Sequence, residues 1–394
     1  MADARSRTPP ARHSGCLERV FLDSAGSSLP PQPVLATVIE HLRREAEVGG
    51  YVAAAERADD LAAVRDSIAR LIGASPVEIA LVDSATRAWC DFFTSIPLGP
   101  GDRVLLSQVE YASNAITALH RAKETGASVE VVPSDPSGRI DLDALARMLD
   151  DRVALVSLVH VPTNGGLINP VREVVDLAHR HGALVLLDAC QSVGQLPIDV
   201  GALGVDALSA TGRKWLRGPR GTGFLYLRGA LARELKPLAM DLHGAQWLSP
   251  DEYLPAADAS RFELWECDVA ARLGLGVAVD YLLSLGIDYA ARAIAAGAER
   301  IRNELDALPG VQVHDLGTDR CGIVTFTVDG REPSGIRDAL ADKGITVTVS
   351  GRSSTLLDMS ARGLDAVVRA SPHYFVSDSD LSRFVDAVSQ LTLE

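Results

Sequence analysis

Residues 187–194 read LDACQSVG and residues 209–223 read SATGRKWLRGPRGTG, and these two blocks decide the fold of the chain. The first block ends an apolar run, Ala183 to Leu187, that is typical of a buried parallel strand. Asp188 therefore stands at the carboxyl end of a strand, where open α/β sheets place their ligands. The second block sets Lys214 between a hydroxyl residue and a glycine-rich turn, so we expect this lysine in a tight loop.

The pair formed by Asp188 and Lys214 suits a pyridoxal phosphate site. A carboxylate beside the pyridine nitrogen keeps that nitrogen protonated, so that the ring withdraws electrons. A lysine amine binds the cofactor covalently and later moves protons. Either residue alone fits an ordinary strand end or a surface turn, but Gln191 and Thr211 stand at matching positions beside them. The four residues together predict a catalytic Lys214 and cofactor contacts from Asp188, Gln191 and Thr211.

The same blocks resemble the class V aminotransferase and cysteine desulfurase family, a branch of the fold-type I pyridoxal phosphate enzymes. That family carries Asp-Ala-x-Gln-Ser-x-Gly at the strand end, followed by Ser-Gly-His-Lys and Gly-Pro-x-Gly-x-Gly. In this chain Thr211 replaces the leading serine of the second motif, and Arg213 replaces its histidine. The resemblance extends from Phe21 to about residue 390, and it implies that Arg213 also binds the cofactor.

Composition sets the broad class of protein. The chain has 394 residues, of which 47% are hydrophobic, so it exceeds the usual size of one core and we expect two domains. Its net charge is −14, so the chain has no surplus of Lys and Arg with which to bind nucleic acid or an anionic membrane. No apolar run reaches the ~18 residues that span a bilayer, and no signal-peptide pattern opens the chain. We therefore expect a cytoplasmic protein that binds neither nucleic acid nor a membrane, and the resemblance implies a small amino acid as its substrate.

The cysteines and histidines predict no metal site. The five cysteines are odd in number and widely scattered, and no pair has metal-ligand spacing; they are Cys16, Cys90, Cys190, Cys267 and Cys321. The nine histidines likewise form no local cluster. We expect reduced thiols that are mostly buried as small hydrophobic groups.

The order of apolar runs predicts the α/β class, with a mainly parallel sheet in a large domain and a smaller α+β domain at the C-terminus. Residues 1–17 are rich in Arg, Pro and Ser without apolar periodicity, and we interpret them as a flexible tail. Residues 18–262 are expected to form the cofactor-binding large domain, with their first segment near the small domain. Residues 263–394 are expected to form the small domain, and residues 234–263 a loop near the mouth of the site.

A strand at residues 79–82 leads into a hydroxyl-rich turn that opens a helix at Ala85 and Thr86. Free N–H groups and the positive end of a helix dipole make such a turn a phosphate site. An ordinary helix cap fits the turn equally well. The resemblance favours Ala85 and Thr86 as phosphate ligands, because the family's phosphate cup lies at a similar Gly-Thr-Thr-Glu-Ala motif.

Three further residues around the ring follow from the resemblance. Residues 110–114 read EYASN where desulfurases carry Glu-His-His-x-Asn with a histidine stacked on the pyridine ring. Tyr111 is the candidate replacement, since its aromatic face can also stack. Thr163 stands where the family has the asparagine that contacts the cofactor's phenolic oxygen. Asn164 is one position away, so the choice between the two stays open.

The substrate contacts and the assembly are also implied by the family. Arg369 matches the Arg-x-Ser-x-His position that binds the α-carboxylate, a task that suits the planar guanidinium fork. Ser27 lies in a segment similar to the one at the substrate end of the cofactor, although a plain loop explains it as well. Glu266 replaces a threonine that caps the phosphate across a dimer interface, and an acid cannot cap a phosphate favourably. The resemblance nevertheless implies a homodimer.

The first interpretation of the reaction is a C–S β-lyase that acts on an S-substituted cysteine or its sulfoxide. Residues 45–54 resemble a segment of hercynylcysteine sulfoxide lyase, the C–S lyase of ergothioneine biosynthesis. The alternatives are amino transfer, desulfurase-type sulfur transfer, and oxidative deamination with decarboxylation of an S-conjugated cysteine, as in lincosamide-type secondary metabolism. A desulfurase needs a nucleophilic cysteine after the strand expected at residues 345–349, but residues 350–355 read SGRSST.

Overall fold

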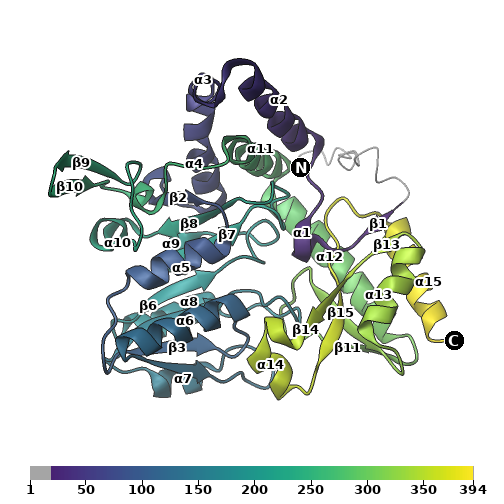
Figure 1. Ribbon diagram of the computed structural model, residues 1–394. Helices are drawn as coiled ribbons and strands as arrows, with labels where there is room; N and C mark the ends of the chain where they lie inside the picture. The colour runs from purple at the N-terminus through teal and green to yellow at the C-terminus, as the bar shows by residue number, and fades with distance from the viewer. Residues whose placement is uncertain (1–18, 394) are drawn as a thin grey trace, which may run out of the picture.

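The computed structural model describes residues 19–393, so the tail expected at residues 1–17 lies outside the described residues (Figure 1). Seven strands form the larger sheet in the order β2-β8-β7-β6-β5-β3-β4. β8 runs antiparallel to β2 and β7, and the other pairs are parallel. The strands are β2 (Ile79–Val82), β3 (Arg103–Ser107), β4 (Ser128–Val132), β5 (Val153–Val159), β6 (Leu184–Asp188), β7 (Ala207–Thr211) and β8 (Gly223–Leu227). The predicted α/β class with a mainly parallel sheet is confirmed.

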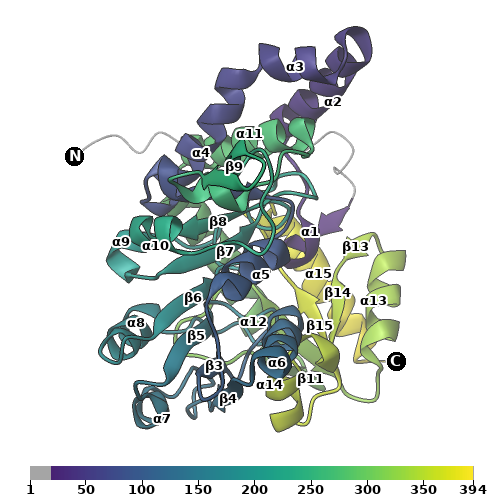
Figure 2. The ribbon, with the colours of Figure 1, turned by 60° about the vertical axis from the view of Figure 1, so that its left-hand side comes forward.

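Successive residues of the central strands enter two different apolar clusters. In β6, Val185 and Leu187 belong to the cluster that includes helix α8, whereas Leu186 belongs to the cluster of helix α5. This alternation buries both faces of the sheet, as a parallel sheet requires. Figure 2 shows α8 and α5 on opposite sides of these strands. The helices around this sheet are α5 (Ala85–Ser95), α6 (Ala112–Thr125), α7 (Leu142–Met148), α8 (Val171–His179), α9 (Val200–Leu203) and α10 (Gly229–Glu234).

A second sheet of four antiparallel strands has the order β11-β12-β15-β14. Its strands and the elements packed beside it are β11 (Val311–Val313), β12 (Val324–Val328), β14 (Thr348–Gly351), β15 (Ala366–Ala370), α13 (Pro333–Asp342) and α15 (Asp378–Leu391). The strand expected at residues 345–349 is split, because β13 (Ile345–Thr346) pairs with β1 (Val20–Phe21) while β14 pairs with β15. The start of the described chain therefore packs against the C-terminal part (Figure 1).

Helix α11 (Val269–Leu285) packs on α2 (Gln32–Val48) and α4 (Ala58–Ile72), and its apolar residues share a core cluster with the large sheet. The next helix, α12 (Ile287–Asp306), begins in that cluster with Ala290 and ends in the cluster of the second sheet. The division of the chain at residue 263 stays a prediction. The packing of α11 with the large domain favours a later boundary, inside α12.

Residues 234–263 were expected to form a loop, and part of that expectation is wrong. They contain a hairpin of β9 (Ala245–Ser249) and β10 (Glu252–Pro255) that extends away from the body of the molecule (Figure 1). Trp247 faces Tyr253 across the two strands, and both side chains are more than half exposed. A ribbon exposed on both faces carries no alternation of apolar and polar residues, so its sequence does not show the strand pattern.

Residues 24–72 are largely helical, and α3 (Gly50–Glu56) begins directly after Gly49, the residue at which α2 ends. Within the described part of the chain, no single helix is long and apolar enough to cross a membrane, and one bent helix pair, α11 with α12, meets those criteria jointly. Over the same residues, no group of three or more His, Cys, Asp or Glu side chains is placed to hold a metal ion.

Candidate active site

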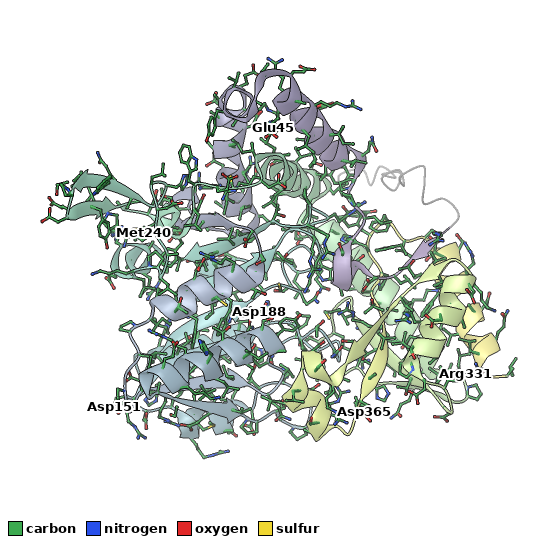
Figure 3. The ribbon with its side chains drawn as sticks, in the orientation of Figure 1. Glu45, Asp151, Asp188, Met240, Arg331 and Asp365 are labelled. Carbon is green, nitrogen blue, oxygen red and sulfur yellow. The ribbon has the colours of Figure 1, made fainter. Side chains whose placement is uncertain are left out.

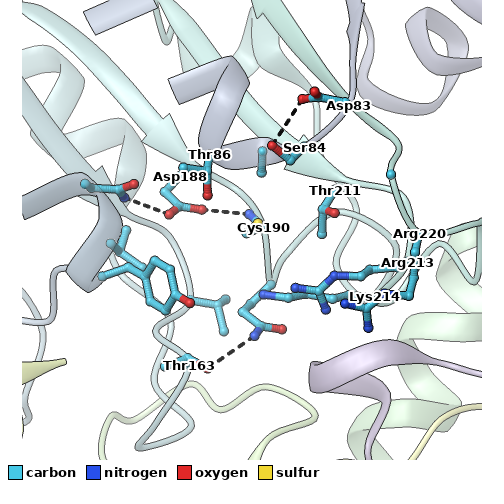
Figure 4. Close-up of a pocket in the computed structure, with 17 residues that line it drawn as sticks. Asp83, Ser84, Thr86, Thr163, Asp188, Cys190, Thr211, Arg213, Lys214 and Arg220 are labelled. Atoms are coloured by element: carbon cyan, nitrogen blue, oxygen red, sulfur yellow. Dashed lines mark hydrogen bonds between the residues drawn. The ribbon is translucent and has the colours of Figure 1, made fainter. Parts of the chain in front are cut away.

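A cavity of about 240 Å³ lies at the carboxyl ends of β5, β6 and β7 (Figure 4). This is the edge at which a parallel sheet presents ligands. Figure 3 places Asp188 near the centre of the molecule, where this edge faces the C-terminal part. The predicted site residues that line the cavity are Ala85, Thr86, Tyr111, Thr163, Asp188, Gln191, Thr211, Arg213 and Lys214. The structure therefore gathers most of the predicted site residues around one space.

The carboxylate of Asp188 is held by two donors. Its Oδ1 accepts from the backbone N–H of Cys190 at 2.9 Å, and its Oδ2 accepts from the side-chain amide of Asn114 at 2.9 Å. Hydrogen bonds to both oxygens fix the plane of the carboxylate. Asn114 was not among the site residues predicted from the sequence. The available signal was its place in the motif at residues 110–114, where the family also has asparagine.

The amine of Lys214 has no hydrogen-bond or ion-pair partner among residues 19–393. Burial lowers its pKa, and the neighbouring positive charge of Arg213 adds to this effect. Figure 4 shows Lys214 and Arg213 side by side at the edge of the cavity. A buried lysine with a lowered pKa carries more of the neutral amine, which is the form that acts as nucleophile and base.

The loop that carries Lys214 is tightly closed, as expected. The N–H of Gly218 donates to the carbonyl of Gly212 at 2.8 Å, and the N–H of Arg217 donates to the carbonyl of Lys214 at 3.0 Å. Arg217 has φ 61°, the one positive value of a non-glycine residue within 19–393. Its guanidinium donates to the carbonyl of Leu29 at 2.7 Å and to the hydroxyl of Tyr374 at 2.9 Å. These contacts hold an otherwise costly backbone conformation.

The start of α5 forms one wall of the cavity. Ser84 caps this helix by accepting from the N–H of Arg87 at 3.1 Å, so Ala85 and Thr86 are its first residues. The helix start rests on Gly223 of β8, where a Cβ atom would lie 2.9 Å from the carbonyl carbon of Ser84 and 3.1 Å from the nitrogen of Ala85. Only glycine allows this approach. The positive helix end therefore faces the space in which a phosphate group is predicted to bind.

Two cavity-lining residues near this helix end were missed by the sequence reasoning. Arg220 and Asp83 both line the cavity. Arg220 stands at the variable position of the Gly-Pro-x-Gly motif, so its place in that motif was the available signal. After Arg213, it is the second residue with a guanidinium group that lines the cavity.

The side-chain amide of Gln191 joins three separate segments of the site by hydrogen bonds. Its amide nitrogen donates to the carbonyl of Ala25 at 3.1 Å and to the hydroxyl of Thr163 at 3.4 Å. The indole of Trp215 donates to its amide oxygen at 2.9 Å. Asn164 does not line the cavity, because its amide donates to Thr355 at 3.1 Å and to the sulfur of Met359 at 3.2 Å. The geometry therefore favours Thr163 for the cofactor contact that the sequence left open.

Arg369 lies on β15, next to the cavity and not in its wall. Its Nη1 donates to the hydroxyl of Thr163 at 2.6 Å, and its Nη2 lies 3.2 Å from Oδ1 of Asp23. The buried Nε–H has no partner. An unpaired buried donor on a guanidinium is costly unless a ligand satisfies it. Burial also lowers the pKa of Arg369.

Ser27 and His243 lie outside the wall of the cavity. Ser27 ends the short helix α1 (Ser24–Ser27), where its N–H donates to the carbonyl of Asp23 at 3.0 Å. The neighbouring Gly26 carbonyl accepts from Arg213. The imidazole of His243 lies 3.3 Å from the carboxylate of the buried Glu263. The substrate contact of Ser27 stays a prediction.

These residues fit pyridoxal phosphate on structural grounds. One cavity contains an unpartnered lysine amine, a carboxylate fixed by two donors and the start of a helix. An aldehyde, a ring nitrogen and a phosphate are the groups that these three features bind.

Comparison with known proteins agrees with this arrangement. The model of the family described as aminotransferase class-V matches residues 20–384. The chain belongs to the class V aminotransferase family. This family member is 30% identical over 388 residues to a probable cysteine desulfurase of Halobacterium salinarum, covering 96% of this chain and 92% of that protein. It is 27% identical to a cysteine desulfurase of Escherichia coli, covering 97% and 95%.

Solved structures share the fold of this class V aminotransferase family member. The apo structure of a cysteine desulfurase from Thermococcus onnurineus NA1 has a TM-score of 0.88 with 25% identity, covering 95% of both chains. The cystine C-S lyase C-DES, in complex with its reaction product cysteine persulfide, has a TM-score of 0.86 with 24% identity, covering 95% of this chain and 98% of that one. The cofactor of this class V aminotransferase family member is pyridoxal 5'-phosphate, as predicted. The likeness to hercynylcysteine sulfoxide lyase stays a prediction.

Proposed function

We propose that this enzyme is a C–S β-lyase that acts on an S-substituted cysteine or its sulfoxide. The bond between sulfur and the β-carbon breaks, and the sulfur leaves with its substituent as a thiol or, from a sulfoxide, as a sulfenic acid. The remaining three-carbon fragment takes up water and yields pyruvate and ammonia. The reaction therefore needs no oxidant and no second amino acceptor.

The side chains of the cavity suit the proton transfers of this reaction. Bound pyridoxal phosphate supplies an electron-withdrawing ring that weakens the bonds at the α-carbon of the amino acid. The neutral amine of Lys214 can then take the α-proton, since burial lowers its pKa. Asp188 holds a proton on the ring nitrogen, and Arg369 binds the α-carboxylate through the fork that now contacts Thr163 and Asp23.

The observation that carries the proposal is the segment after β14. Residues 352–361 form the short helices η4 (Arg352–Ser354) and α14 (Leu356–Ala361), with Thr355 buried between them against Asn164. This segment contains no cysteine. The nearest thiol toward the N-terminus, Cys321, is buried and has its pKa raised to about 12 by burial. A packed segment without a thiol supports release of sulfur on the substrate's own fragment.

The second candidate is sulfur transfer of the desulfurase type. The similarity to cysteine desulfurases favours it, and so does Cys190, which lines the cavity. Against it, burial raises the pKa of the Cys190 thiol to about 11, so the thiol stays protonated at neutral pH. A protonated thiol is a poor nucleophile toward sulfur.

We expect no lasting sulfur adduct on the protein and stoichiometric pyruvate from S-substituted cysteines or their sulfoxides. The purified enzyme is incubated with free L-cysteine, and its intact mass is then measured. A panel of cysteine S-conjugates is tested in parallel for pyruvate and ammonia. Cys190→Ser is the matched variant, and its lyase rate should equal that of the wild type. An adduct of one sulfur atom that passes to an acceptor and disappears in Cys190→Ser would establish the desulfurase instead.

We also expect a homodimer with the site beside the interface. A second hollow of about 480 Å³ adjoins the site, shares Asp83 and Gly221 with it, and is lined by Glu266 and Arg272. Glu266 and its neighbour in sequence, Trp265, are both exposed. Sedimentation equilibrium of the holoenzyme measures the assembly. A fully active monomer would contradict the expectation and would leave this hollow open to solvent.

A further inference from the structure

A second carboxyl group, that of Glu110, lies near Asp188 and outside the cavity. Glu110 follows β3 and is 1% exposed. Its Oε1 accepts from the amide nitrogen of Asn114 at 2.8 Å and from the N–H of Tyr111 at 2.9 Å. Its Oε2 lies 2.8 Å from the hydroxyl of Ser157 on β5. No atom of Glu110 lines the cavity, so it does not touch the cofactor.

Asn114 connects Glu110 to Asp188. Its one amide nitrogen donates to Oε1 of Glu110 and to Oδ2 of Asp188, at 2.8 and 2.9 Å. An amide nitrogen has two hydrogens, so both bonds form at once and fix the amide plane. All three side chains are at least nine-tenths buried. Rotation of Asn114 would therefore break a buried hydrogen bond to each carboxyl group.

We propose that Glu110 is a positioning residue for the cofactor, which acts through Asn114 to hold the Asp188 carboxylate in line with the pyridine nitrogen. The inference rests on the pyridoxal phosphate assignment and applies whichever reaction follows. Without Glu110, the Asn114 amide loses its second acceptor and can turn away from Asp188. The carboxylate then keeps only the Cys190 N–H, which fixes one oxygen but leaves its plane free to rotate.

The charge of Glu110 is compatible with this role. Burial raises its pKa to about 8, and the negative charge of Asp188 adds to the effect. Below that pH the Glu110 carboxyl keeps its proton, so Asp188 is the one negative charge beside the ring nitrogen. The groups that face Glu110 from neighbouring elements are Asn114 of α6 and Ser157 of β5, which are uncharged, and Asp188 of β6 through Asn114.

The test compares two cofactors that differ at one atom. Pyridoxal phosphate and its 1-deaza analogue, in which carbon replaces the ring nitrogen, are each exchanged onto the full-length protein. Their dissociation constants are measured by equilibrium dialysis for the wild type, Glu110→Ala, Asn114→Ala and Glu110→Gln. The side-chain amide that Glu110→Gln introduces cannot be charged and keeps an acceptor oxygen for Asn114, so this variant is the conservative rescue.

We expect Glu110→Ala and Asn114→Ala each to weaken pyridoxal phosphate binding about tenfold, while binding of the deaza analogue changes less than about twofold. Glu110→Gln should stay within about twofold of the wild type for both cofactors. Equal losses for both cofactors would overturn the inference, because the defect would then lie in packing and not at the ring nitrogen. So would a Glu110→Gln variant that binds as weakly as Glu110→Ala. If Glu110→Ala fails to fold, Glu110→Leu, which fills the same space and offers Asn114 no acceptor, takes its place in the comparison and is judged by the same two outcomes.

Discussion

Lys214→Ala is expected to remove the borohydride-reducible link between cofactor and protein and to lower turnover by about 10³-fold or more. The wild-type holoenzyme should be yellow, and reduction should attach the cofactor permanently to the peptide that contains Lys214. The reason is geometric, since the amine lies free at the wall of the cavity and burial lowers its pKa. Visible spectra and peptide mass spectrometry measure both effects.

The matched control is Lys123→Ala, which removes an exposed lysine from α6. This variant should keep the colour, the reducible link and the full rate. If a reduced cofactor still appeared on a lysine of the Lys214→Ala protein, the covalent attachment would belong to another residue and the assignment of the site would fail.

Arg369→Ala is expected to raise the KM for the amino acid about 30-fold or more while the cofactor absorbance stays unchanged. Loss of a buried fork to a carboxylate costs about 2 to 5 kcal/mol, and 2 kcal/mol corresponds to about a 30-fold change. Here the substitution also leaves Asp23 facing the substrate carboxylate without its cation. Steady-state kinetics on the preferred S-substituted cysteine separates KM from kcat.

Arg337→Ala is the control for Arg369, because Arg337 is an exposed arginine paired with its neighbour Asp338 on α13. Its KM should match that of the wild type. Arg369→Lys keeps the charge and loses the planar fork, so its KM should fall between those of the wild type and Arg369→Ala. An unchanged KM in Arg369→Ala would move the carboxylate site to another cation, and Arg213 would be the first to test.

The site residues that could be predicted from the sequence lie in short stretches whose backbone conformation is determined by the residues next to them. Asp188 ends an apolar strand and Lys214 sits in a glycine-rich loop, so their neighbours in sequence already determine where they point. Asn114 differs, because its contact with Asp188 joins residues that are 74 positions apart. Such a contact follows from the order of strands in the sheet, which no local pattern contains.

Pairings between distant segments also account for the places where the observed fold differs from the predicted one. The run at residues 345–349 shows one β pattern, yet its two halves pair with strands from opposite ends of the chain. Helix α11 is apolar on most sides, so its sequence shows that it is buried but not against which partners. The two strands of the hairpin show no alternation of apolar and polar residues. The pairing of Trp247 with Tyr253 therefore becomes apparent only in the structure.

The left-handed backbone at Arg217 makes the order of events during synthesis matter. This conformation costs about 1 to 3 kcal/mol for a residue that is not glycine. The contacts that offset this cost come from Leu29 near the start of the chain and from Tyr374 and Phe375 near its end. A ribosome-bound chain that stops before residue 374 has the lysine but lacks the later part of this support. We therefore expect cofactor capture to be a late step of biogenesis, and chains that end before residue 374 should be colourless.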